Sequence, residues 1–205
     1  MSSRETVLSS VRQAIVGAVA PEVHRTYSHD LQLDRVAVLD LFVERVDDYR
    51  ADVRVIGAAD LAGTIGSVLA SHGATGVVVP ADLDPSWLTT VTCEVLRDDP
   101  PVDARRLDEI SAVVTASAVS IALTGTIVLD AGAGQGRRVI SLIPDLHLCV
   151  VRADQVVGTV PEAMPRLDAT RPLTWISGPS ATSDIELDRV EGVHGPRTLV
   201  VLLVT

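Results

Sequence analysis

From residue 52 to the end of the 205-residue chain, short aliphatic runs alternate with segments of helical periodicity. The runs are rich in β-branched and aliphatic residues, which favours buried strands. We expect strands at 53–56, 76–79, 94–97, 112–115, 126–129, 148–151, 173–176 and 198–204. Helices are expected at 60–71, 87–91, 103–110 and 155–167. This alternation predicts a mostly parallel sheet covered on both faces, which is a three-layer α/β sandwich.

The first fifty residues predict two amphipathic helices joined by an irregular polar stretch. Ser2 and Glu5 have the spacing of a capping box, and apolar residues follow with helical periodicity as far as Val19. A second helix is expected over 36–46, where apolar positions again fall on one face.

The length fits one domain with an N-terminal appendage. We therefore expect an N-terminal helical segment, 1–50, packed on or beside the domain, and an α/β domain, 51–205.

The composition excludes several kinds of chemistry. All 17 basic residues are arginine, against 27 acidic residues, for a net charge of −10. Without lysine the chain has no amine for a Schiff base and no P-loop lysine. Any anion must be held by arginine, hydroxyl groups and backbone N–H groups. The negative charge and an aromatic content of 2% disfavour nucleic-acid binding, which uses basic surfaces and stacking platforms.

Metal sites and membrane spans are not expected either. Cys93 and Cys149 lie far apart, without the paired spacing of a zinc or iron–sulfur site. The uncharged stretch from Ala112 to Leu129 contains Ser, Thr and Gly, which favours buried strands and a turn over a membrane span. We expect a cytoplasmic protein without a cofactor of its own.

Three segments beside predicted strands offer hydroxyl groups, guanidinium groups or glycine N–H groups that suit an anion. The first is the Thr-Gly-Thr turn at 124–126. The second is the pair of arginines that ends the glycine-rich loop of 130–138, and the third is a hydroxyl-rich loop that starts at 177. The glycine spacing is GxGxG and not that of a dinucleotide-binding fingerprint, so ordinary turns remain the alternative for the first two. The expected ligand-binding residues are Thr124, Gly125, Thr126, Arg137, Arg138, Gly178, Pro179, Ser180 and Thr182.

The candidate acid–base groups are Asp184, Glu186 and His194. The two carboxylates are two positions apart and share one side of the chain where the backbone is extended. His194 lies between glycines, outside any apolar face. Structural roles in orienting these loops remain the alternative, and His147, at the start of a strand, is interpreted as structural.

The order of four segments resembles the LUD-domain family, and within it the subgroup of lactate-utilisation C components. The segments are Thr124-Gly-Thr126, RVISLIP at 138–144, GPSATSDIE at 178–186 and GVHGPR at 192–197. The resemblance implies a three-layer fold like that of the sugar-phosphate isomerases and CoA-transferases. It also implies a cluster-free component of a bacterial system that oxidises L-lactate to pyruvate, with iron–sulfur proteins as partners.

Two other functions remain open on the same fold. One is a stand-alone enzyme or binding protein for a sugar phosphate, an acyl-CoA or a related anion, and the other is a regulatory module without catalysis. The family often carries an acidic residue just before Thr-Gly-Thr, where this chain has Leu123. No acid–base role is therefore assigned to that position.

Overall fold

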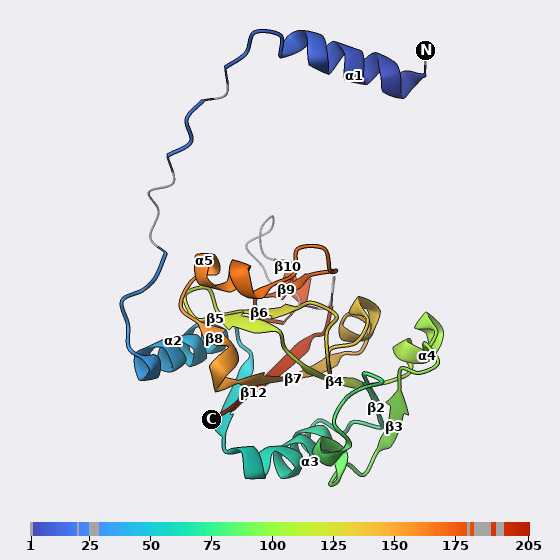
Figure 1. Ribbon diagram of the computed structural model, residues 1–205. Coiled ribbons are helices and arrows are strands. Elements are labelled where there is room, and N and C mark those ends of the chain that lie inside the picture. The colour runs from blue at the N-terminus through green and yellow to red at the C-terminus, as the bar shows by residue number, and fades with distance from the viewer. Residues whose placement is uncertain (1, 20, 25–28, 180, 183–189, 192–194) are drawn as a thin grey trace.

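A computed structural model describes residues 2–19, 21–24, 29–179, 181–182, 190–191 and 195–205. Its main sheet has six parallel strands in the order β1–β12–β7–β4–β2–β3 (Figure 1). The strands are β1 (Asp52–Ile56), β2 (Gly76–Val79), β3 (Glu94–Arg97), β4 (Ala112–Ala116), β7 (Leu146–Arg152) and β12 (Thr198–Val204). The parallel sheet predicted from the alternation of elements is confirmed.

The central strands β7 and β12 are buried on both faces, which explains why they read as continuous aliphatic runs. Leu148 and Leu202 contribute to a core cluster on one face, whereas Cys149 and Val201 contribute to a cluster on the other. The two strands run in register, with Val201 beside Cys149. Side chains in register therefore share a face of the sheet.

Helices and a smaller sheet cover the two faces, giving the predicted three-layer α/β sandwich (Figure 1). Helix α3 (Leu61–Ser71) covers one face with an apolar stripe that includes Leu61, Ile65, Val68 and Leu69. Helix α2 (Arg35–Asp48) covers β1 and β12 on the opposite face, where Val38, Phe42 and Val46 are buried at a spacing of four.

The second sheet has the strand order β8–β5–β6–β9. Its strands are β5 (Val119–Ile121), β6 (Thr126–Leu129), β8 (Val156–Val157) and β9 (Thr174–Ile176). β6 pairs antiparallel with β5 and with β9, while β5 and β8 are parallel. The strands expected at 126–129 and 173–176 thus exist but belong to this second sheet. The uncharged stretch from Ala112 to Leu129 forms β4, β5, a turn and β6, as predicted.

The helix expected at 155–167 is wrong in its first half. Val156 and Val157 form strand β8, and a single helical turn, α5 (Val160–Ala163), follows after Gly158. The β-branched pair is buried beside β5, and Gly158 and Pro165 both oppose a continuous helix. The remaining short elements are η1 (Ala58–Asp60), η2 (Pro85–Leu88), η3 (Arg138–Ser141), η4 (Ala153–Gln155), η5 (Met164–Arg166), α4 (Ala104–Asp108), and a hairpin of β10 (Ala181–Thr182) and β11 (Val190–Glu191).

Helix α1 (Ser3–Ala14) begins with the predicted capping box. The Glu5 N–H donates to Ser2 Oγ at 3.3 Å, and the Ser2 N–H donates to Glu5 Oε2 at 2.7 Å. No residue of α1 is buried, and Figure 1 shows the helix apart from the α/β body. The division of the chain after residue 50 stays a prediction.

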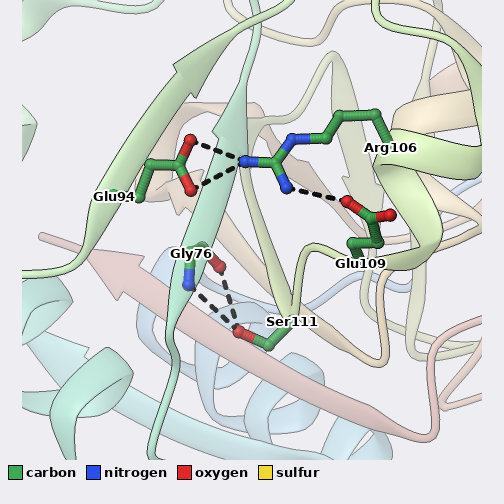
Figure 2. A network of polar contacts seen from close by, with 5 residues as sticks. All are labelled: Gly76, Glu94, Arg106, Glu109 and Ser111. Atoms are coloured by element: carbon green, nitrogen blue, oxygen red, sulfur yellow. Dashed lines mark hydrogen bonds and ion pairs between the residues drawn. The ribbon is translucent and has the colours of Figure 1, made fainter.

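Polar contacts attach α4 to the edge of the main sheet (Figure 2). Arg106 Nη2 donates to both carboxylate oxygens of Glu94 on β3, at 2.7 and 2.8 Å, and Nη1 donates to Glu109 at 2.8 Å. Ser111 Oγ, just before β4, donates to the Gly76 carbonyl at 3.0 Å. These contacts hold α4 over β2 and β3 at the edge of the sheet.

Among the described residues, the structure contains no helix with the length and apolar character needed to cross a bilayer.

Candidate functional site

A cavity of about 430 Å³ lies between η3, the start of β7, strand β9 and the start of β12. We call it the inter-sheet cavity, because β7 and β12 belong to the main sheet and β9 to the second. Its polar lining includes Arg138, His147 and Ser177, and its apolar lining includes Trp175 and Leu199. The wall is about equally polar and apolar, and a few polar groups that can fix the orientation of a ligand are typical of small-molecule sites.

Of the predicted ligand-binding residues that the structure describes, three line this cavity: Arg138, Gly178 and Pro179. Gly178 has φ +86°, and a Cβ at this position would lie 2.5 Å from the Tyr49 Cβ atom. Glycine is therefore required both by the backbone conformation and by the approach of Tyr49, the residue that ends α2.

The Thr-Gly-Thr turn does not line the cavity but contacts one of the residues that do. Thr126 Oγ1 lies 2.8 Å from Thr124 Oγ1 and 2.8 Å from Ser177 Oγ, so a chain of hydroxyl groups ends at a residue of the cavity wall. Gly125 has φ +57°, and a Cβ here would lie 2.8 Å from the backbone of Arg45 in α2. The turn therefore orients Ser177, which the sequence interpretation did not include, and packs against α2.

Arg137 and Arg138 point to different places. Arg137 Nε donates to Asp98 Oδ2 and its Nη2 donates to Asp98 Oδ1, both at 2.6 Å. Arg137 Nη2 also donates to the Val102 carbonyl at 2.9 Å. Burial raises the pKa of Asp98. The hydrogen bonds from Arg137 and from the Val102 N–H together lower this pKa by more than burial raises it, so the net shift is downward. Asp98 raises the pKa of Arg137 in return.

Arg137 lies on a second cavity, of about 460 Å³, at the carboxyl ends of β2 and β3. The glycine-rich loop closes over these strand ends, and the Ala116 N–H at the end of β4 donates to the Gly134 carbonyl at 2.7 Å. Within the main sheet, the chain continues from β2 to β3 on one side and from β4 to β7 on the other side, so the strand order reverses between β2 and β4, next to this cavity. Ligand sites in open α/β sheets are expected at such a point. Its two arginines are each paired, Arg137 with Asp98 and Arg171 with Asp130 at 3.0 Å.

His147, interpreted from the sequence as structural, lines the inter-sheet cavity although it is only 1% exposed. Its Nε2 lies 2.8 Å from Thr115 Oγ1 on β4. Burial lowers the pKa of His147 to about 4, so the ring is neutral at pH 7. Burial likewise raises the pKa of the neighbouring Cys149 to about 12, against a small opposing effect of a hydrogen bond from Thr115.

One signal in the sequence marks this group. His147 and Cys149 lie two positions apart in an otherwise aliphatic strand, so they share one face of the sheet. Thr115 is in register with Cys149 on the neighbouring strand and joins the same face. A buried polar group is costly unless it is hydrogen-bonded, which makes such a trio informative.

Several predicted site residues lie outside the described residues: Ser180, Asp184, Glu186 and His194. Thr182 lies in the β10–β11 hairpin, and its backbone pairs with Val190. Within the described ranges, no three His, Cys, Asp or Glu side chains are grouped so that they could hold a metal ion.

The chain is similar to known proteins over most of its length. It is 49% identical to a protein named Lactate utilization protein C of Deinococcus radiodurans, over 97% of this chain and 93% of the relative. A protein of the same name from Geobacillus sp. (strain WCH70) is 29% identical, over 72% of this chain and 70% of the relative.

A crystal structure of a DUF162 family protein from Deinococcus radiodurans has the same fold, with a TM-score of 0.74 and 46% identity. It covers 84% of this chain and 99% of its own. The LUD domain model matches residues 39–204, which include most of α2, both sheets and the inter-sheet cavity. With this match and close identity to a relative across nearly the whole chain, the protein belongs to the LUD domain family.

Proposed function

We propose that this protein is a cluster-free, cytoplasmic component of a bacterial system that oxidises L-lactate to pyruvate. The names of its relatives in Deinococcus and Geobacillus support a role in lactate utilisation. We further propose that the inter-sheet cavity binds a small anionic ligand of that system.

The state of Arg138 carries the proposal of an anion site. Arg138 lines the cavity, and among the described residues its guanidinium group has no carboxylate partner, whereas that of Arg137 is occupied by Asp98. An arginine that is not neutralised by the protein is suited to bind a carboxylate through two parallel hydrogen bonds. Ser177 and Gly178 line the same cavity and offer a hydroxyl group and a backbone N–H group as further donors.

The cavity volume of about 430 Å³ fits a small acid and lies in the range of small-molecule sites. Oxidation of lactate to pyruvate releases two electrons and two protons. The two cysteines of the chain, Cys93 and Cys149, lack the spacing of a cluster site, so we propose that the electrons pass to iron–sulfur partner proteins. The net charge of −10 favours partners that present basic surfaces.

Titration calorimetry with sodium L-lactate tests the anion site. We expect Arg138→Gln to weaken binding by about tenfold or more, as for the loss of a charge-assisted hydrogen bond. Arg105→Gln is the matched control, because Arg105 is exposed on α4, away from the cavity, and the charge change is the same. Equal affinity of wild type and Arg138→Gln would contradict the site. Ribose 5-phosphate and acetyl-CoA in the same titrations test the alternative ligands.

Growth tests the role in the cell. A strain in which the gene is deleted should fail to grow on L-lactate as sole carbon source and should grow normally on pyruvate. A tagged copy should restore growth and retain iron–sulfur proteins on purification. Normal growth of the deletion strain on L-lactate would contradict the proposed role in lactate oxidation.

A further inference from the structure

The inter-sheet cavity presents a second polar group beside Arg138, the imidazole ring of His147. We propose that Nδ1 of His147 accepts a hydrogen bond from a hydroxyl group on the carbon next to the ligand carboxylate. The cavity would then select 2-hydroxy acids over 2-oxo acids and over acids without a substituent. This inference rests on the proposed function, because it assumes that the inter-sheet cavity is the ligand site.

Strand register places the ring at the cavity wall. His147 is the second residue of β7 and pairs with Leu199, the second residue of β12. Residues in register on parallel strands project to the same face, and both of these residues line the cavity. The ring is held in place, because its Nε2 lies 2.8 Å from Thr115 Oγ1 and Thr115 is fully buried.

The hydrogen-bond network determines which ring nitrogen carries the proton. The Thr115 hydroxyl is positioned to donate to Cys149 Sγ at 3.7 Å, and the Cys149 thiol to donate to the Ala116 carbonyl at 3.9 Å. With Nε2–H donating to Thr115, every proton in this chain of contacts has an acceptor. The Thr115 hydroxyl has one proton, and because that proton is donated to Cys149, the Thr115 oxygen is the acceptor toward the ring. We therefore assign the ring proton to Nε2.

The remaining nitrogen, Nδ1, is a lone-pair acceptor that no described residue uses. His147 lines the cavity and its Nε2 faces Thr115, so we infer that the other ring nitrogen, Nδ1, opens into the cavity. An acceptor in such a position is satisfied by a ligand that brings a donor.

The neutral state of the ring agrees with this role. The pKa of His147 is lowered to about 4 by burial, so Nδ1 keeps its lone pair throughout the physiological range.

The ligand chemistry follows from one acceptor and one cation in the same cavity. The carboxylate binds Arg138, and a 2-hydroxyl donates to Nδ1. A 2-oxo acid presents a carbonyl oxygen to Nδ1, so that two sets of lone pairs face each other. Propionate has no polar group on the carbon next to its carboxylate and leaves Nδ1 unpaired. A site built to pair with a hydroxyl group discriminates against analogues that lack it, because its own polar group is left unpaired.

Titration calorimetry with L-lactate, pyruvate and propionate tests the inference. We expect wild type to bind L-lactate about tenfold more tightly than either other acid, as for one hydrogen bond. In His147→Gln, the amide replaces Nε2–H toward Thr115 but offers no acceptor in place of Nδ1. The preference for L-lactate should disappear while propionate binding stays unchanged. His147→Asn, whose amide oxygen takes a position near that of Nδ1, should restore part of the preference.

The outcomes separate this inference from the proposed function. If the three acids bind wild type equally, or if His147→Gln keeps the preference, the role of His147 is overturned and the anion site stands. If no acid binds wild type, both are overturned.

A spectroscopic measurement covers the case in which the variants do not fold. The ¹⁵N spectrum of wild-type protein labelled at histidine should show His147 protonated at Nε2 only. Protonation at Nδ1 would overturn the inference without any substitution.

Discussion

Arg137 and Asp98, 39 positions apart in the sequence, form a pair in which two guanidinium N–H groups meet two carboxylate oxygens at 2.6 Å. The burial of the two partners is unequal, since the Asp98 side chain is 3% exposed and that of Arg137 is 41% exposed. The pair holds the glycine-rich loop against the end of β3, so its effect should appear in stability.

The unequal burial predicts an unequal cost of removing each partner. Arg137→Gln leaves a buried carboxylate without its cation and should lower the free energy of unfolding by about 3 kcal/mol. Asp98→Asn leaves an arginine that water solvates and keeps an acceptor for the Val102 N–H, so we expect a loss of about 1 kcal/mol. Urea unfolding at pH 7 measures both values.

Arg152 and Asp154 supply the control for this experiment, because their exposed side chains also form an ion pair, at 3.1 Å. Arg152→Gln should change the free energy of unfolding by no more than about 0.5 kcal/mol. Equal losses for Arg137→Gln and Asp98→Asn would show that the burial of Asp98 does not set the cost.

Gly125 tests the packing of the Thr-Gly-Thr turn on α2. Gly125→Ala combines a left-handed backbone, at φ +57°, with a Cβ 2.8 Å from the Arg45 backbone. Gly73 is the matched control, because it has φ +64° but nothing within 4 Å of an added Cβ. We expect Gly73→Ala to cost about 1 kcal/mol and Gly125→Ala about 3 kcal/mol, the difference being the clash with α2. Thermal unfolding measures the stability of both variants. Similar losses of stability in the two variants would show that the clash with α2 contributes little.

The four central strands of the main sheet, β2, β4, β7 and β12, could be predicted from the sequence because each is a local aliphatic run that is buried on both faces. The edge strands β1 and β3 are mixed runs of charged and aliphatic residues and are partly exposed. The second sheet could not be predicted, because β5 and β8 are three and two residues long and form only through pairing with distant segments. The helix predicted at 155–167 is wrong in its first half for the same reason, because Val156 and Val157 form a strand only by pairing with β5, where they are buried.

The candidate site was predictable where one residue type carries the chemistry, as at Arg138 and Gly178. The different environments of Arg137 and Arg138 depend on the position of Asp98, which no local pattern encodes. The sequence predicts a structural role for His147 because it stands at the start of a strand. Its place in the cavity wall depends on how the two sheets pack, which no local pattern encodes.

The low pKa of His147 predicts a pH dependence of stability. The unfolded histidine, with a pKa of 6.5, takes up a proton before the folded one, whose pKa is about 4. The free energy of unfolding therefore falls as the pH decreases from about 6.5 to about 4, by about 3 kcal/mol from this group. His147→Gln should flatten the curve over this window, measured by urea unfolding at several pH values.

Wild type is the reference for that measurement, because the two proteins differ only at residue 147. Asp98 also loses its stabilising charge at low pH, but it does so in both proteins, so the difference between the two curves reports on His147. Parallel curves for wild type and His147→Gln would rule out the burial of a neutral ring.

The two cysteines should differ in reactivity toward a thiol reagent such as dithionitrobenzoate. Cys149 is fully buried and its pKa is raised to about 12, so almost none of it is thiolate at pH 8. Cys93 is partly exposed, and burial raises its pKa, which slows its reaction without blocking access. One thiol per chain should react in the native state and two in denaturant. Cys93→Ser should abolish the native reaction, and a variant that still reacted natively would show that the reagent reaches Cys149 in the folded protein.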